Sequence, residues 1–110
     1  MKRTFETIRK NEEFKRTFRI GRKAGDRYQT FYAAENGLAY NRIGPVISKK
    51  VGNSVVRHRY CRLIREIFRL TDLDKTGFDI VVRAGYAAAG APYSELEASF
   101  RRLAGKLSLL

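Results

Sequence analysis

Few side chains in this sequence could make or break a covalent bond. Its 110 residues include one histidine, His58, and one cysteine, Cys61. Hydrolysis of a phosphodiester by a protein needs a general acid and a general base, or a cluster of metal ligands. One His and one Cys cannot supply a His pair or a zinc site of familiar spacing, and the sequence has no GxxxxGK[ST] phosphate loop. We therefore predict that the chain carries no catalytic residue of its own, and no metal ligand can be assigned.

The acidic residues that lie close together have ordinary structural explanations. Asp72 and Asp74 fall in a polar, turn-forming stretch, where both carboxylates would be solvated. Glu12 and Glu13 follow Asn11, a residue that favours the start of a helix, and carboxylates there stabilise the positive end of the helix dipole. Neither pair predicts an acid–base site.

Positive charge is what the sequence has in excess. Its 23 Lys and Arg residues against 11 Asp and Glu residues give a net charge of +12. A small fold with that charge repels itself, and binding to a polyanion is the usual compensation. We expect nucleic acid, with an anionic membrane or an acidic protein as the alternatives. No apolar run approaches the roughly 20 residues that span a bilayer, so we predict no membrane partner.

The charge is concentrated in residues 48–69, where seven residues are Lys or Arg and only Glu66 is acidic. At about 100° per residue, a helix over this stretch has one apolar side and one basic side. The apolar side holds Val56, Tyr60, Leu63 and Ile67. The basic side holds His58, Arg62, Arg65 and Arg69, with Arg59 at its margin.

Two interpretations of the basic side are open. A row of charges is most often a solvated helix face, but such faces usually mix signs and form i,i+4 pairs. Here arginine dominates, which favours planar, bidentate recognition of phosphate. Lys49 and Lys50 precede Gly52, and the helix N-terminus that follows attracts anions. The pattern favours contact with an RNA backbone.

The elements that must position these residues form one domain over residues 1–110, with residues 1–8 loosely ordered. We predict helices over 11–20 and from Asn53 or Ser54 to 70, and strands over 27–34, 42–48 and 78–83. Asn36-Gly37 is the strongest turn signal, and Pro45 implies either an edge position or an outward-facing N–H in its strand. Ser94 and Glu97 form a capping box for a last helix, whose apolar stripe is Leu96, Phe100, Leu103, Leu107 and Leu110.

The order αββαβα predicts an α+β fold, a two-layer α/β sandwich around one core. The second strand, the long helix and the third strand form a βαβ unit. The general rule makes the crossover of such a unit right-handed.

The basic segment resembles the signature of the bacterial ribonuclease P protein component. That pattern has Ser-Lys-Lys, Gly-Asn-Ala-Val and Arg-Asn-Arg, then basic residues up to an Ile-Arg. This sequence has Ser-Lys-Lys at 48–50, Gly-Asn-Ser-Val at 52–55, Arg-His-Arg at 57–59, then Arg62, Ile64 and Arg65. The resemblance covers residues 8–107. It departs at His58, where the family has Asn, at Cys61, where Lys is common, and at Pro45, where an aliphatic residue is usual.

The resemblance implies a ribosomal-protein-S5-domain-2-like sandwich with a left-handed βαβ crossover, against the general rule. It also implies a subunit of ribonuclease P, an endoribonuclease that removes the 5′ leader of precursor tRNA. The partners would be the catalytic RNA, which performs the chemistry, and precursor tRNA, with no DNA. The implied cofactor is Mg²⁺ bound mainly by the RNA, without an organic cofactor. The single cysteine fits a reducing, cytoplasmic location.

The resemblance assigns residues to two RNA surfaces. The catalytic RNA would contact Lys49, Lys50, Asn53, Arg57, His58, Arg59, Arg62, Arg65 and Arg69. A cleft between the first helix and the sheet would hold the leader through Phe14, Lys15, Phe18, Arg27 and Tyr32.

Each assignment has an alternative. The rings at Phe14 and Phe18 could stack on unpaired bases, at about 1–3 kcal/mol per base, or simply pack in the core. His58 could donate to RNA or be a neutral surface residue. The alternative function is a non-catalytic RNA-binding module, such as a ribosomal protein or an assembly factor, which would purify with ribosomal RNA.

Overall fold

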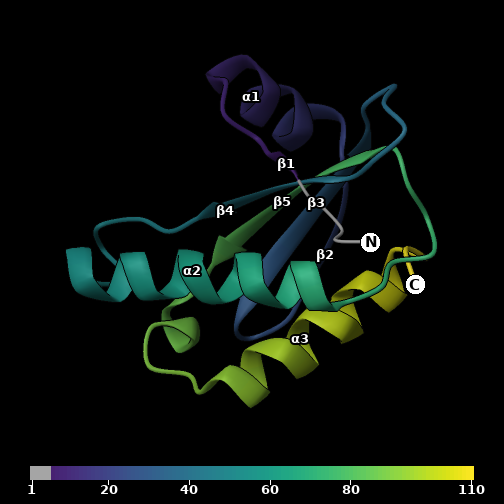
Figure 1. Cartoon of the computed structure of the whole chain (residues 1–110). Coiled ribbons are helices and arrows are strands. Elements are labelled where there is room, and N and C mark those ends of the chain that lie inside the picture. The colour runs from purple at the N-terminus through teal and green to yellow at the C-terminus, as the bar shows by residue number, and fades with distance from the viewer. Residues whose placement is uncertain (1–5) are drawn as a thin grey trace.

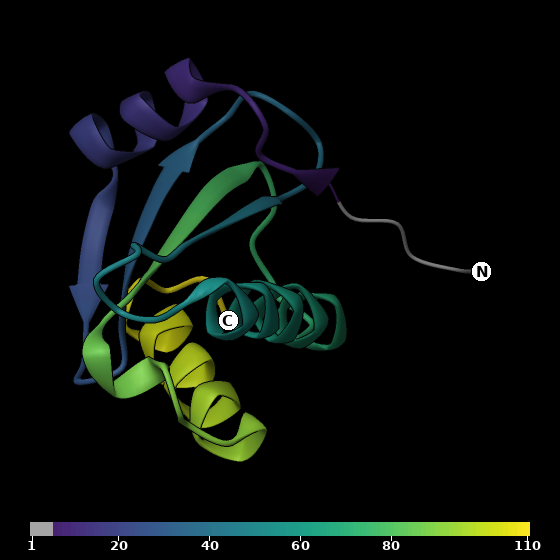
Figure 2. The ribbon, with the colours of Figure 1, turned by 90° about the vertical axis from the view of Figure 1, so that its left-hand side faces the viewer.

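A five-stranded sheet in the order β1-β4-β5-β3-β2 organises the computed structural model, which describes residues 6–110. Helices α2 and α3 cover one face of the sheet, and α1 lies over part of the other face (Figures 1 and 2). Within the described residues, no helix is long and apolar enough to cross a membrane. The elements in chain order are β1 (Glu6–Thr7), α1 (Asn11–Ile20), β2 (Arg22–Gly25), β3 (Gln29–Glu35), β4 (Arg42–Val46), α2 (Ser54–Leu70), β5 (Phe78–Ala84), the 3₁₀ turn η1 (Tyr86–Ala88) and α3 (Tyr93–Lys106).

The core lies between the sheet and the pair α2 and α3. Alternate residues of β3 and β5 point into it, because side chains along a strand alternate between faces. Phe31 and Val82 are opposite each other in the register and are fully buried. The Phe31 ring meets Phe100 of α3 edge to face, with centroids 4.8 Å apart. The apolar side predicted for α2 is confirmed at Tyr60, Leu63 and Ile67, which are buried.

Strands β4 and β5 are parallel neighbours joined by α2. The chain leaves β4, runs back along α2 on one face of the sheet and then enters β5. This β4–α2–β5 connection turns in a left-handed sense (Figures 1 and 2). The left-handed crossover implied by the resemblance is therefore confirmed, and the general right-handed rule does not hold here. β1 pairs only with Arg42 and Ile43 of β4. Pro45 consequently lies on a free sheet edge, as its missing N–H predicts.

The structure has the order βαβββαβα, which contains two strands, β1 and β2, that the predicted order αββαβα lacks. β1 is two residues long, too short to show an alternating pattern. β2 has the sequence Arg-Lys-Ala-Gly, which lacks the apolar alternation of a typical strand. The prediction of a loosely ordered segment is wrong from Glu6 onward, because Ile8 is 3% exposed and its N–H donates to Ile43 O. Residues 1–5 lie outside the described residues.

Three local predictions also need correction. The strand predicted from residue 27 begins at Gln29, because the Asp26 carboxylate accepts the Tyr28 and Gln29 N–H groups and holds a turn. α3 begins at Tyr93, directly after Pro92, so Ser94 lies inside the helix and does not cap it. The chain leaves the helix after Lys106, which leaves Leu110 43% exposed and buries Leu109 in its place.

Candidate nucleic-acid interface

The outward face of α2 carries two exposed arginines that form no hydrogen bond or salt bridge within the described part of the chain. Asn53 caps the helix, its Oδ1 accepting the Val56 N–H at 3.0 Å. The buried residues Tyr60 and Ile67 fix which side points inward. Arg62 and Arg65 are exposed on the other side, and neither makes an ion pair or hydrogen bond with any described residue. Both guanidinium groups are therefore available to a phosphate.

The other cations of the predicted row are partly engaged within the protein. The Arg69 guanidinium pairs with Glu66, with Nε donating to Oε1 at 3.2 Å. This hydrogen bond raises the pKa of Arg69 and lowers that of Glu66. Arg59 donates to Ala91 O at 3.1 Å, and Arg57 donates to Gly52 O at 3.1 Å. Of the five arginines predicted to contact the catalytic RNA, Arg57, Arg59 and Arg69 thus have a hydrogen-bond acceptor, and Arg62 and Arg65 have none among the described residues.

The loop before α2 adds further exposed groups. Lys49 and Lys50 lie in a turn closed by the hydrogen bond from Val51 N–H to Ser48 O. His58 is exposed one turn into the helix. The Asn53 side-chain oxygen is used by the cap, so only its amide N–H groups could reach a ligand.

A buried polar chain ties α2 to the rest of the fold. Tyr60 Oη donates to Gln29 Oε1 at 2.8 Å, and Gln29 Nε2 donates to Ser99 Oγ at 3.0 Å. Ser99 Oγ donates to Asp26 Oδ2, which also pairs with Arg102, both at 2.7 Å. Burial alone would raise the pKa of Asp26, but these donors outweigh it and lower that pKa. Because Tyr60 lies opposite Arg62 on the helix, the chain also fixes which way the free arginines face.

The other face of the sheet is organised in three cross-strand rows. The register places Ala34, Asp79 and Arg42 in the first row. It places Tyr32, Val81 and Gly44 in the second. The third row is Thr30, Arg83 and Val46.

Helix α1 covers the first row by an ion-pair network. Arg42 donates from Nε and Nη2 to the two oxygens of Asp79, each at 2.7 Å, and from Nη1 to Glu13 Oε2 at 3.0 Å. The hydrogen bonds that Arg42 donates to Asp79 and Glu13 raise the pKa of its guanidinium group. Burial would raise the pKa of Glu13, yet hydrogen bonds from Arg42 and the Lys10 N–H lower it. The network fastens the start of α1 to the sheet.

Helix α1 covers the second row by aromatic packing. The Phe14 ring lies so close to Gly44 that a Cβ there would be 2.6 Å from Phe14 Cε1. Phe14 therefore packs against the sheet, which favours the core interpretation for this ring. Phe18 meets Tyr32 edge to face with centroids 4.8 Å apart, and the Lys23 Nζ lies 5.8 Å from the Tyr32 centroid.

The third row is left uncovered and forms a groove of about 580 Å³, which we call the α1 groove. Phe18 is the one predicted leader residue that lines it directly, and Tyr32 supports Phe18 from behind. Lys15 is exposed on α1, and Arg27 is exposed in a turn that touches Gly85. The full lining is Phe18, Thr30, Val46, Ser48, Val51, Arg83, Ala84, Gly85 and Tyr86.

Sequence reasoning missed most of this lining. Arg83 could have been predicted from the sequence, because strand alternation places it on the same face of the sheet as Val81. Tyr86 could also have been predicted, as a single aromatic in a small-residue loop, and it is 71% exposed. Thr30 and Val46 could not have been predicted from the sequence, because only the strand register brings them beside Arg83.

The comparisons with known proteins agree with this arrangement. Residues 1–108 match the Ribonuclease P family. The chain belongs to that family. It is 41% identical over 110 residues to the ribonuclease P protein component of Thermoanaerobacter sp. (strain X514), covering 99% of this chain and 95% of the relative. It is also 41% identical to that of Lachnoclostridium phytofermentans over 100 residues, covering 90% and 86%. The Staphylococcus aureus RNase P protein superposes with a TM-score of 0.87 at 27% identity, covering 96% and 98%.

As a ribonuclease P protein component, the chain is a subunit of an endoribonuclease and associates with the RNA of that enzyme. The predicted fold class is confirmed by the same structural likeness. The alternative of a ribosomal protein or assembly factor is not favoured by these relatives.

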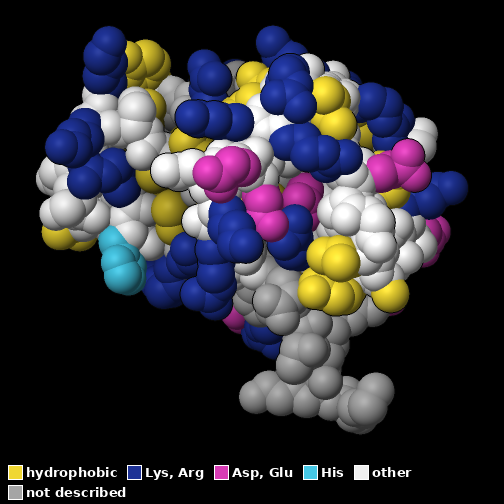
Figure 3. All heavy atoms as spheres, turned by 90° about the horizontal axis from the view of Figure 1, so that it is seen from above, with side chains coloured by type: hydrophobic (Ala, Val, Ile, Leu, Met, Phe, Trp, Pro, Cys, Tyr) yellow, Lys and Arg dark blue, Asp and Glu magenta, His cyan; other side chains and the backbone are white. Residues whose placement is uncertain are grey.

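The charge on the α1 side suits a ribonuclease P subunit. In Figure 3 dark-blue Lys and Arg side chains spread over this face, and acidic side chains gather near its middle. The Glu13–Arg42–Asp79 network accounts for part of the acidic charge on this face. No group of three or more His, Cys, Asp or Glu residues within the described part of the chain could hold a metal ion.

Proposed function

We propose that this chain binds the catalytic RNA with the outward face of α2 and its preceding loop, and the 5′ leader of precursor tRNA in the α1 groove. The separation of two surfaces on opposite faces of one sheet carries the proposal, because α2 lies on one side of the sheet and α1 on the other (Figure 2). A single surface would force the two RNAs to compete. Two surfaces let the protein hold enzyme RNA and substrate together.

The α2 surface has the chemistry of backbone contact. Arg62 and Arg65 offer free guanidinium forks, which match phosphate oxygens bidentately. Lys49 and Lys50 add point charges beside the helix N-terminus. Because the major groove of an RNA helix is too deep and narrow for side chains to read its base edges, this surface would recognise the shape and charge of a folded RNA.

The α1 groove has the chemistry of single-strand binding. Phe18 and Tyr86 provide aromatic surface for unpaired bases, and Arg83 provides one cation for the backbone. The hydroxyls of Thr30 and Ser48 can donate to phosphate or ribose oxygens. One cation among mostly uncharged side chains suits a strand of variable sequence.

Magnesium belongs with the RNA in this proposal. RNA phosphates supply the oxygen ligands that Mg²⁺ prefers, and this chain lowers the repulsion between two RNAs by bringing +12 of charge. The chain itself moves no proton and carries no catalytic residue. We place the reaction in the cytoplasm, where precursor tRNA is made in bacteria.

Reconstitution tests the proposal. The chain is mixed with a bacterial ribonuclease P RNA at low magnesium, and removal of the 5′ leader from precursor tRNA is followed on gels. We expect cleavage well above that of the RNA alone, with tighter binding of precursor than of mature tRNA. The same rate with and without the protein would contradict the proposal.

A further inference from the structure

A second groove lies on the α2 side of the sheet, between α2 and the free end of β4. Its volume is about 620 Å³, within the range of about 300–1,000 Å³ that holds small ligands. It is open to solvent and is lined by Pro45, Val46, Ile47, Ser54, Arg57, His58, Cys61 and Arg65. We call it the edge groove.

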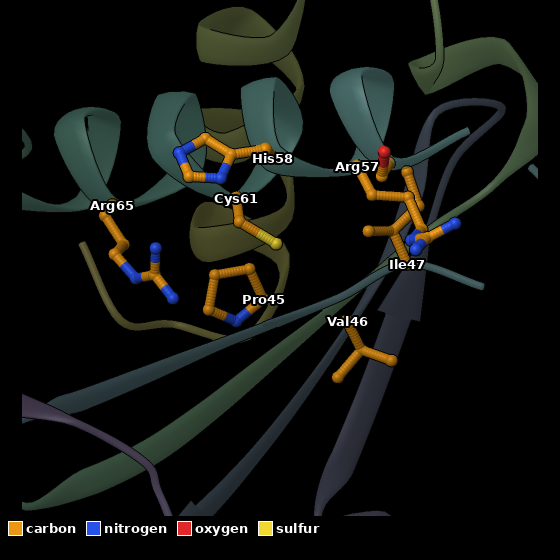
Figure 4. Close-up of a pocket in the computed structure, with 8 residues that line it drawn as sticks. Pro45, Val46, Ile47, Arg57, His58, Cys61 and Arg65 are labelled. Atoms are coloured by element: carbon orange, nitrogen blue, oxygen red, sulfur yellow. The ribbon is translucent and has the colours of Figure 1, made fainter. Parts of the chain in front are cut away.

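The edge groove has an apolar floor and basic ends. In Figure 4 the Cys61 side chain points from α2 toward the Pro45 ring, and Ile47 continues this apolar strip. Arg65 lies at one end of the strip and Arg57 at the other. No described acidic residue lines the groove.

The two guanidinium groups differ in freedom. Arg57 is held by its hydrogen bond to Gly52 O, so its remaining N–H groups keep one direction. Arg65 is exposed and has no partner among the described residues. Arg57 can therefore bind an anion at one end of the groove in a fixed position, and Arg65 can move its guanidinium group to contact an anion at the other end.

We infer that the edge groove holds one unstacked nucleotide of the catalytic RNA, with its base on Pro45, Ile47 and Cys61 and its phosphates between Arg57 and Arg65. This inference rests on the proposed binding of the catalytic RNA by α2. It adds an insertion site for a base to a surface that otherwise contacts only the backbone.

The lining selects this occupant over a peptide. An exposed strand edge can add a strand from another protein, but that mode requires a regular row of backbone donors and acceptors. Pro45 removes a donor from the middle of this edge. Paired arginines beside an apolar strip instead complement a base with its phosphates.

The lining also selects the catalytic RNA over the leader. Five of the eight lining residues belong to α2, the helix that faces the catalytic RNA. The α1 groove opens on the other face of the sheet, and Val46 is the one residue that lines both the α1 groove and the edge groove. The inserted nucleotide would therefore lie just across β4 from the leader.

Cys61 allows a direct steric test, because it is the only cysteine in the chain. The folded protein is modified with methyl methanethiosulfonate or benzyl methanethiosulfonate, which add a small or a large group through a reducible disulfide. Burial raises the pKa of the Cys61 thiol, so the reaction is run at about pH 9, where more thiolate forms. Circular dichroism and a urea titration of each adduct verify that the protein stays folded, and Cys61→Ser treated identically is the control.

Binding of each adduct to ribonuclease P RNA is then measured over a range of salt. We expect the benzyl adduct to bind about tenfold more weakly, the loss of one base contact, with an unchanged salt slope. The methyl adduct should bind like the unmodified protein, and dithiothreitol should restore the benzyl adduct. Equal affinity of the benzyl adduct and the unmodified protein would overturn the inference.

Three further outcomes separate this inference from the proposed function. A benzyl adduct that binds the catalytic RNA normally but weakens precursor tRNA binding to the holoenzyme would assign the groove to the leader and overturn the inference. If Arg62→Ala also fails to change the affinity for the catalytic RNA or its salt slope, the proposed role of α2 fails as well. If Arg62→Ala weakens binding while the benzyl adduct does not, only the base-insertion site is wrong.

Discussion

The outward face of α2 and the α1 groove are built in different ways. The α2 face is made by one helix, and its free cations Arg62 and Arg65 are three residues apart in the sequence. The α1 groove is made by α1, three strands, the loop before α2 and the segment around η1, so its lining runs from Phe18 to Tyr86. The first is dense in charge, whereas the second has the single cation Arg83 among its described lining residues.

This difference predicts different sensitivities. A surface on one helix survives as long as the helix is packed, so single substitutions there should change binding and little else. A groove assembled from several segments depends on what holds those segments together. Substitutions far from the groove, at the network that fastens α1, should therefore affect the groove first.

The largest effect is expected for Arg42→Ala. It leaves Asp79, whose side chain is 2% exposed, as a buried carboxylate without its ion pair, which typically costs about 3–5 kcal/mol. Urea unfolding should show this loss of stability. Arg69→Ala is the matched control, because both members of its pair with Glu66 are exposed, and a solvated ion pair adds little to stability. Similar losses for the two variants would show that the network does not anchor α1.

A second effect is expected for the double variant Arg62→Ala/Arg65→Ala. Each lost phosphate contact lowers the slope of log affinity against log salt by about 0.9 on a duplex, so the slope should fall by about 1.8. Filter binding to the catalytic RNA at several salt concentrations measures it. Arg69→Ala, which removes a cation already paired with Glu66, should change the slope much less. A slope change as large for Arg69→Ala would remove the distinction between free and paired arginines.

A third effect is expected for Phe18→Ala. Loss of one ring that stacks on a base should weaken precursor tRNA binding by about 1–3 kcal/mol. Binding of mature tRNA and of the catalytic RNA should stay unchanged, because the proposed function places neither of them in the α1 groove. Competition between precursor and mature tRNA for the reconstituted holoenzyme measures the effect. Equal losses for precursor and mature tRNA would show that the two surfaces are not separate.

The smallest effect concerns pH. The pKa of Asp26 is lowered in the folded state, so its ionised form adds stability above its unfolded pKa. That stability is lost as the pH falls through the lower, folded pKa, in the acid range below about 4. Urea unfolding at a series of pH values should show a weaker acid dependence for Asp26→Asn than for the unsubstituted chain. An identical acid dependence would show that the buried chain from Tyr60 to Asp26 does not stabilise the ionised carboxylate.

The helical surface was predictable because its geometry is local. The apolar positions Tyr60, Leu63 and Ile67 recur at the spacing of a helix, so the position of Arg62 and Arg65 on the opposite side follows from the sequence. The engagement of Arg59 was not predictable, because its acceptor, Ala91 O, is 32 residues away. The pairing of Arg69 with Glu66 is local in the sequence. Whether the two side chains form an ion pair nevertheless depends on their rotamers, which the spacing of the residues does not determine.

The sequence by itself determined the family, the inward and outward sides of α2, and the excess of cations over acids. Only the tertiary structure decided the coverage of two cross-strand rows by α1 and the two grooves on either side of Val46. The physical reason is the separation along the chain of the residues that form each feature. A helix face repeats every few residues along the chain, whereas a groove forms where strand register and long-range ion pairs such as Arg42–Asp79 bring distant segments together.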